Sequence, residues 1–252
     1  MAISWALRKQ LKILVFIAIL AFAVVGWIIY SFRPAPSCTD GKLNQQEEQI
    51  DCGGECDACI GTPRDLSILW AKPFKISEGR YEVGALIENP NSTVGARAFS
   101  YTLKLFEGNT IVGQREGSTF LNPREKFLIY EGDIGVGERV PTIAGVEINE
   151  IPWKVFKNEK PNILISSKTF ETSSSGNGRV KVVLKNQTLF PISNIYVSVV
   201  LMDSFGSVIG VSQSKVDSIQ GEASEEVFLT WRQVFNPSPA NIDVYLRTDL
   251  TR

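Results

Sequence analysis

Apolar and polar residues alternate in short runs over most of the chain beyond about residue 65. Two examples are residues 81–87 (YEVGALI) and 98–105 (AFSYTLKL), and turn formers such as 89–91 (NPN) separate such runs. No stretch of a dozen residues here carries a convincing helical period. Short alternating segments bounded by turn residues are typical of strands with one buried face. The pattern predicts a mainly β fold built as antiparallel sandwiches.

The alternating region occurs twice. A shift of 97 residues places Asn89 on Asn186 and Leu103 on Val200. The matched positions agree in order and spacing more than in identity, a pattern that a generic sandwich sequence could partly imitate. Each copy has about 90 residues, which is close to the size of an immunoglobulin-like unit.

We therefore expect two tandem sandwiches, residues 63–150 and 162–252. Residues 151–161 form the linker between them, which two prolines bracket and stiffen. Placed end to end at about 40 Å each, the sandwiches would extend about 80–100 Å.

The segment 11–32 is apolar throughout, and no charge occurs between Lys12 and Arg33. As a helix at about 1.5 Å per residue it would span about 33 Å, close to the bilayer hydrocarbon core of about 30 Å. The segment predicts a transmembrane helix that holds the chain in the lipid bilayer. A cleaved signal peptide and a buried core helix are the alternatives.

The charges around this segment predict its orientation. Basic residues, Arg8 among them, precede the apolar run without any acidic residue. The positive-inside rule then places residues 1–10 in the cytoplasm and the C-terminal region outside the cell. The predicted localisation is the cell membrane, crossed once.

The four cysteines lie within residues 33–62 with the spacing C-x13-C-x3-C-x2-C, at Cys38, Cys52, Cys56 and Cys59. On the exported side such a cluster predicts two disulfides, because exported segments this poor in apolar residues need covalent support. A four-cysteine zinc site is the alternative. Three disulfide pairings are possible, and the spacing does not choose among them.

Oxygen-bearing side chains are interspersed with these cysteines, at Asp40, Asn44, Glu47 and Asp51. Carboxylate and amide oxygens on a glycine-punctuated loop suit Ca²⁺. The competing interpretation is that these residues form turns and face solvent. No other cofactor is expected.

Residues 38–59 resemble a short motif of bacterial and archaeal surface proteins, C-x-D-G-x2-N-x2-E-x3-D-C-G-G-x-C-x2-C, at every fixed position. In the second copy, residues 197–210 and 220–222 resemble the strand–turn–strand centre and later turn of the FxLYD family. Residues 87–91 of the first copy look like late-embryogenesis-abundant sandwiches. The latter two resemblances imply immunoglobulin-like folds with binding or structural roles and no catalytic residues.

Composition excludes several kinds of chemistry. The chain has a net charge of −1 and contains no histidine. It therefore lacks the basic excess of a general nucleic-acid binder, and histidine-based catalytic triads and zinc sites are excluded. Asn91 and Asn186 lie in glycosylation sequons, for which the alternative is an ordinary turn asparagine.

These patterns together predict a non-enzymatic, membrane-anchored protein that displays two sandwiches at the cell envelope to a protein partner. One alternative is an accessory subunit of an envelope assembly, such as a pilus or a secretion machine. Another is a surface hydrolase, which would need carboxylates that converge in a pocket.

Overall fold

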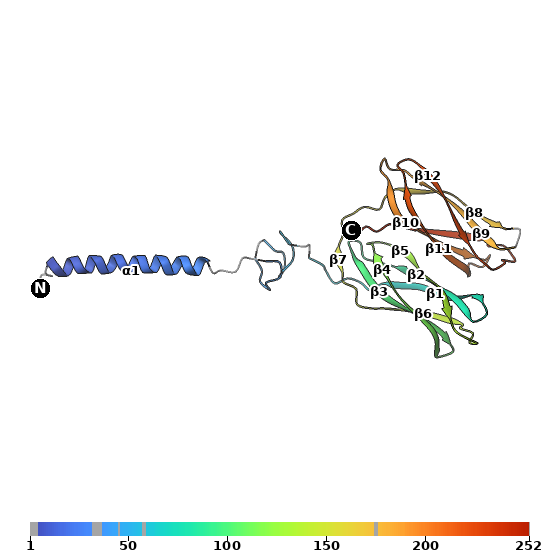
Figure 1. The fold of residues 1–252 in the computed structure, drawn as a ribbon, viewed down its shortest axis with the longest axis horizontal. Helices are drawn as coiled ribbons and strands as arrows, with labels where there is room; N and C mark the ends of the chain where they lie inside the picture. Colours follow the sequence, from blue (N-terminus) through green and yellow to red (C-terminus); the bar gives the residue numbers. More distant parts are fainter. Residues whose placement is uncertain (1–4, 32–36, 45, 57–58, 174–175, 252) are drawn as a thin grey trace. The chain divides into compact units, whose positions relative to one another are not determined.

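The computed structural model describes residues 5–31, 37–44, 46–56, 59–173 and 176–251. The chain divides into two compact units, Met1–Cys59 and Ile60–Arg252. The first holds a helix and the cysteine segment, and the second holds all the strands (Figure 1).

The helix of the first unit, α1, runs from Trp5 to Ser31. Among the described residues, no helix combines the length and apolar character needed to cross a membrane. The prediction of a transmembrane helix at 11–32 is therefore wrong.

Two disulfides join the cysteines of the first unit. Cys38 bonds to Cys56 and Cys52 bonds to Cys59, with Cα atoms 5.6 and 4.9 Å apart. The first cysteine thus pairs with the third and the second with the fourth. The prediction of two disulfides is confirmed.

The first sandwich consists of two sheets with the orders β1-β2-β5 and β4-β3-β6, and β7 pairs with the start of β3. Buried apolar side chains from both sheets form one core between them. The strands are β1 Ser67–Ser77, β2 Arg80–Glu88, β3 Val94–Glu107, β4 Thr110–Leu121, β5 Lys126–Gly135, β6 Ile143–Ile148 and β7 Lys154–Val155.

The second sandwich has the same arrangement, with the sheet orders β8-β9-β12 and β11-β10-β13 around a second core. The strands are β8 Ile163–Thr172, β9 Gly178–Asn186, β10 Ile192–Met202, β11 Val208–Ile219, β12 Ser224–Thr230 and β13 Asn241–Arg247. The prediction of a mainly β fold is confirmed.

The strand register corrects one part of the sequence alignment. Leu103 lies opposite Val146 in the first sandwich, whereas Val199, not Val200, lies opposite Val244 in the second. The paired positions Leu201 and Gly210 of the second sandwich are one residue further apart in sequence than their equivalents Leu105 and Gly113 of the first. The aligned shift in β10 is therefore 96 rather than 97. A one-residue slip moves a side chain to the other face of its sheet, and Val200 accordingly faces away from its own core.

The predicted linker, residues 151–161, is part of the first sandwich. Its short strand β7 places Val155 opposite Val94 of β3, and Trp153 packs against the first core. The segment is therefore held along the sandwich that it leaves.

The two sandwiches lie side by side, not end to end (Figure 1). The outer face of the β1-β2-β5 sheet meets that of the β11-β10-β13 sheet. Phe74 and Leu128 from the first sandwich pack there against Val200 and Val211 from the second. We call this buried apolar cluster the junction. The expected extension of about 80–100 Å does not occur.

Candidate functional site

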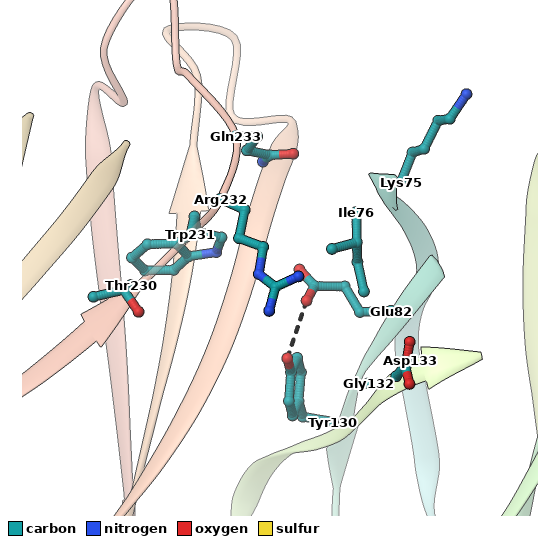
Figure 2. Close-up of a pocket in the computed structure, with 10 residues that line it drawn as sticks. All are labelled: Lys75, Ile76, Glu82, Tyr130, Gly132, Asp133, Thr230, Trp231, Arg232 and Gln233. Atoms are coloured by element: carbon teal, nitrogen blue, oxygen red, sulfur yellow. Dashed lines mark hydrogen bonds between the residues drawn. The ribbon is translucent and has the colours of Figure 1, made fainter. Parts of the chain in front are cut away.

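A cavity of about 300 Å³ opens between the two sandwiches beside the junction (Figure 2). We call it the cleft. One wall comes from β1, β2 and β5, and the other comes from the end of β12 and the residues after it. The lining residues are Lys75, Ile76, Glu82, Tyr130, Gly132, Asp133, Thr230, Trp231, Arg232 and Gln233.

An irregularity in strand pairing shapes the first wall. The β2–β5 register shifts between Tyr81 and Val83, and Asp133 on β5 has a left-handed backbone with φ of 58°. Such bulges redirect side chains locally. This one places Gly132 and Asp133 on the wall of the cleft, and the Asp133 carboxylate lies 3.2 Å from Nε of Arg80.

Glu82 places a half-buried carboxylate on the same wall. Tyr130 donates a hydrogen bond of 3.0 Å from its hydroxyl to Oε2 of Glu82 (Figure 2). Burial raises the pKa of Glu82 above its ordinary value, and the hydrogen bond from Tyr130 opposes this shift in part. The pKa of Tyr130 also lies above its usual range because of burial and the nearby Glu82 charge. The hydrogen bond from Tyr130 thus offsets only part of the cost of burying the Glu82 charge in the cleft.

The second wall contributes a guanidinium. Arg232 follows β12, and Figure 2 shows its side chain extending toward Glu82 and Tyr130. No ion-pair or hydrogen-bond partner for Arg232 occurs among the described residues. Lys75, the other cation of the lining, is paired with Glu78 at 2.9 Å. Arg232 can therefore bind an anionic group that enters the cleft.

Trp231 holds the second wall in place. Its side chain is 5% exposed and belongs to the second core. Its indole Nε1 donates a hydrogen bond of 2.8 Å to the carbonyl of Val211, a junction residue. The adjacent position of Arg232 is therefore fixed by the core of the second sandwich.

A buried ion pair fastens the sandwiches together at a second place. Arg247 of β13 inserts its guanidinium beside Glu125, with Nε 3.0 Å from Oε1 and Nη2 3.0 Å from Oε2. The rings of Phe120 and Phe127 each lie 4.1 Å from the guanidinium carbon. Both charged side chains are buried, at 4% and 7% exposure. We call this pair the latch.

Hydrogen bonds extend the latch along the C-terminal segment. Asn122 donates from Nδ2 to the carbonyl of Thr248 at 2.9 Å and accepts from the amide of Leu250 at 3.0 Å. Arg97 donates from Nε to the carbonyl of Thr251 at 3.1 Å. The segment that follows β13 is therefore bound to the first sandwich.

Three of the four residues of the calcium hypothesis accept hydrogen bonds from nearby backbone amides, and the fourth, Asn44, donates from Nδ2 to Oδ2 of Asp40 at 3.0 Å. Asp40 accepts from the amide of Lys42, Asp51 from that of Gly41, and Glu47 from those of Asn44 and Asp51, at 2.9 to 3.2 Å. Oδ1 of Asn44 is buried without a partner among the described residues. Among those residues, no three acidic or cysteine side chains gather as a metal site would require. The turn-forming interpretation describes these contacts, and calcium binding stays a hypothesis.

The two sequon asparagines use their side-chain amides inside the fold. Asn186 is fully buried, and its Nδ2 donates to the carbonyls of Phe190, Ile219 and Gln220. Asn91 donates from Nδ2 to the carbonyl of Arg64 at 2.7 Å. A glycan on either nitrogen would have to displace these bonds. The geometry therefore favours structural turn asparagines.

The cleft and the latch were not among the sequence predictions, but one sequence signal points to the junction beside them. Residues 127–130 (FLIY) and 199–202 (VVLM) are continuous apolar runs. Strands that are buried on both faces have such runs instead of alternation. These runs identify β5 and β10 as strands with a second buried face, which is the junction.

No protein-family model matches this chain, and no curated protein matches it either. The proposed resemblances to the FxLYD and late-embryogenesis-abundant families, and to the surface-protein motif, therefore stay predictions.

Proposed function

We propose that the protein is a non-catalytic binding protein of an exported, oxidising compartment, and that its two sandwiches act as one rigid binding module. The observation that carries the proposal is the cleft, because its two walls belong to different sandwiches. The junction and the latch hold these walls together. Two disulfides in a segment with little apolar core support export.

The chemistry of the cleft indicates the kind of group that it binds. Arg232 offers charged donors that have no partner among the residues that the structure describes, and Glu82 offers a half-buried acceptor that has one hydrogen bond from Tyr130. Buried charged groups require compensation, which a ligand can provide. The cleft suits a polar group on a partner protein that carries both a carboxylate and a hydrogen-bond donor.

Photo-crosslinking in the cells that produce the protein tests this proposal. A photoreactive benzophenone amino acid replaces Thr230, which is exposed and lines the cleft, and a control replaces Lys215 on β11. We expect a discrete crosslinked partner from position 230 that is lost when Arg232→Ala is added. A crosslink that survives Arg232→Ala, the same product from position 215, or no product from position 230 would contradict the proposal.

A surface hydrolase is the second candidate, because Glu82 and Asp133 both line the cleft. Two carboxylates in one cavity are the basic requirement of acid–base hydrolysis of glycosidic bonds. Hydrolysis of polysaccharide substrates by the native protein, abolished by Glu82→Gln and by Asp133→Asn separately, would favour this function over binding alone.

A further inference from the structure

The two sandwiches differ along one side. In the first sandwich, the edge strands β1 and β6 pack against each other. In the second, the corresponding edges β8 and β13 do not pack along their length and are joined by the Lys168 side chain, which bonds to the carbonyl of Ile242, whereas β11 and β12 close the opposite side. A groove therefore lies along the β8–β13 side of the second sandwich, where the first sandwich is closed.

Two cavities make up this groove, of about 650 and 170 Å³. They share Ile165 of β8 and Val244 of β13, so they continue into each other along the strands. We call the combined feature the strand groove. It is lined by different residues from the cleft.

The edges of the strands, and not one face alone, border the groove. Residues 165–168 of β8 and 243–245 of β13 line it consecutively. Successive side chains of a strand point to opposite faces, so consecutive lining residues expose the strand edge itself. The carbonyl of Ile242 on β13 faces this side, where it accepts a hydrogen bond from Nζ of Lys168. Unpaired edges of this kind are templates for another strand.

Apolar side chains of the second core remain accessible through the groove. Ile163, Ile165, Val244 and Leu246 pack against that core and are only partly buried. All four line the smaller cavity. An added strand with apolar residues at alternate positions would cover them.

The rim of the groove is basic. Lys126 and Lys160 are exposed and have no ion-pair partner among the described residues. Lys168 is exposed and bonds to a neutral carbonyl. The single lining carboxylate, Asp243, lies near the Tyr245 hydroxyl, whose pKa is raised by burial and by the Asp243 charge. An acidic occupant is therefore favoured electrostatically.

We propose that the strand groove binds an extended acidic segment of a partner protein, which adds a strand between β8 and β13. Backbone hydrogen bonds to an open edge hold the segment, its alternate apolar residues cover the second core, and its acidic residues meet the lysines of the rim. This inference names a partner chemistry at a second site and does not depend on what the cleft binds.

Calorimetric titration of the full-length protein with designed peptides tests the proposal. The probe is a seven-residue peptide with both ends capped, in which valine alternates with glutamate. One control is a peptide of the same composition with its valines and glutamates in two separate runs. Two further controls are the alternating peptide N-methylated on all valines and the alternating peptide N-methylated on all glutamates. In a strand these two sets of N–H groups point to opposite edges, so strand addition uses at least one set.

We expect the alternating peptide to bind. The peptide with valines and glutamates in separate runs should bind at least tenfold more weakly. At least one N-methylated peptide should also bind at least tenfold more weakly, since it loses several backbone hydrogen bonds of about 1 kcal/mol each. Lys126→Glu with Lys160→Glu should weaken binding by about threefold or more at low salt. Lys215 lies on β11, at the edge opposite β13 in the same sheet, and Lys215→Glu should leave peptide binding unchanged. Glu82→Gln in the cleft should also leave it unchanged.

Amide hydrogen exchange locates the bound peptide on the protein. Protection should appear in residues 163–168 and 241–247. Absence of binding by the alternating peptide at millimolar concentration would overturn the proposal. Binding of both N-methylated peptides as tight as that of the unmethylated peptide, or protection confined to other strands, would overturn it as well. None of these results bears on the cleft, so failure here and failure of the proposed function are distinguishable.

Discussion

Arg247 is the single residue on which the contact between the sandwiches depends most. Its guanidinium is paired with Glu125 on two nitrogens and enclosed by two phenylalanine rings. Removal of one partner of a buried pair leaves the other charge uncompensated, which typically costs about 3–5 kcal/mol. Arg247→Ala should therefore lower the free energy of unfolding by about this amount in urea denaturation.

An exposed pair provides the control for this prediction. Arg139 lies 2.8 Å from Glu107 with a side chain that is 65% exposed. Arg139→Ala should cost less than about 1 kcal/mol, because exposed ion pairs contribute little. The double variant Arg247→Met with Glu125→Leu should recover part of the loss, since it leaves no buried charge. Equal effects of Arg247→Ala and Arg139→Ala would show that the latch is not buried in solution.

Glu82 makes the stability of the protein depend on pH in a definite direction. Burial raises its pKa in the folded state above the unfolded value of about 4.5. As pH rises through 4.5 and then through the raised folded value, the unfolded state loses its proton first, so the folded state loses stability relative to it. Glu82→Gln removes this dependence.

The Glu82→Gln variant should therefore gain stability relative to the native protein as pH rises from 4 to 7. The measurement is the difference in the free energy of unfolding between the two proteins at both pH values. Glu78→Gln is the control, since that carboxylate is exposed on the β1–β2 connection. A difference that is constant with pH, or that changes in the native protein's favour, would contradict the assigned burial of Glu82.

At the scale of elements, the alternating pattern was sufficient to predict a mainly β fold. It could not fix the strand equivalences, because hairpin length decides the register. The β10–β11 hairpin has one more residue between its paired positions Leu201 and Gly210 than the first sandwich has between Leu105 and Gly113. This moved the aligned position from Val199 to Val200, and with it the side chain from the core to the junction. Disulfides were predictable from cysteine number, but their pairing was not, since the order of cysteines is compatible with three connectivities.

The cleft and the latch were beyond sequence prediction for a related reason. Glu82, Arg232 and Arg247 acquire their roles from elements that lie far away in the chain. A charged residue near the end of a strand usually faces solvent, and only the packing of two outer faces buries Arg247.

The apolar segment 11–32 shows the opposite error, because uniform apolar character predicted a membrane span that the described helix does not provide.

The cysteine segment should lose its structure independently of the strands. Its described residues contain one isolated β-bridge, between Gln49 and Cys52, and two disulfides close loops with sequence separations of 18 and 7. Reduction removes the constraint that orders these loops. With dithiothreitol, amide exchange should become rapid over residues 37–56, and the thermal midpoint of the strand-rich unit should not change.

The control for reduction is the same treatment of a protein with all four cysteines changed to serine, which should already exchange rapidly over residues 37–56. A shift of several degrees in the thermal midpoint of the strands on reduction would contradict the division of the chain at residue 59.

At the scale of the whole molecule, the account depends on the two sandwiches forming one body. The junction buries the outer faces of four strands, and the latch and the C-terminal segment add polar contacts from the second sandwich to the first. Two cores that share a buried interface of this kind should unfold together. The cleft keeps its shape only while they stay packed.

Differential scanning calorimetry of the full-length protein tests this claim most directly, by comparing the native chain with Val200→Asp. That substitution places a carboxylate in the junction, away from both cores. The native strand-rich unit should give one transition with equal calorimetric and van't Hoff enthalpies, and Val200→Asp should give two separate transitions. Two transitions in the native protein, or a single unshifted transition in Val200→Asp, would contradict the account.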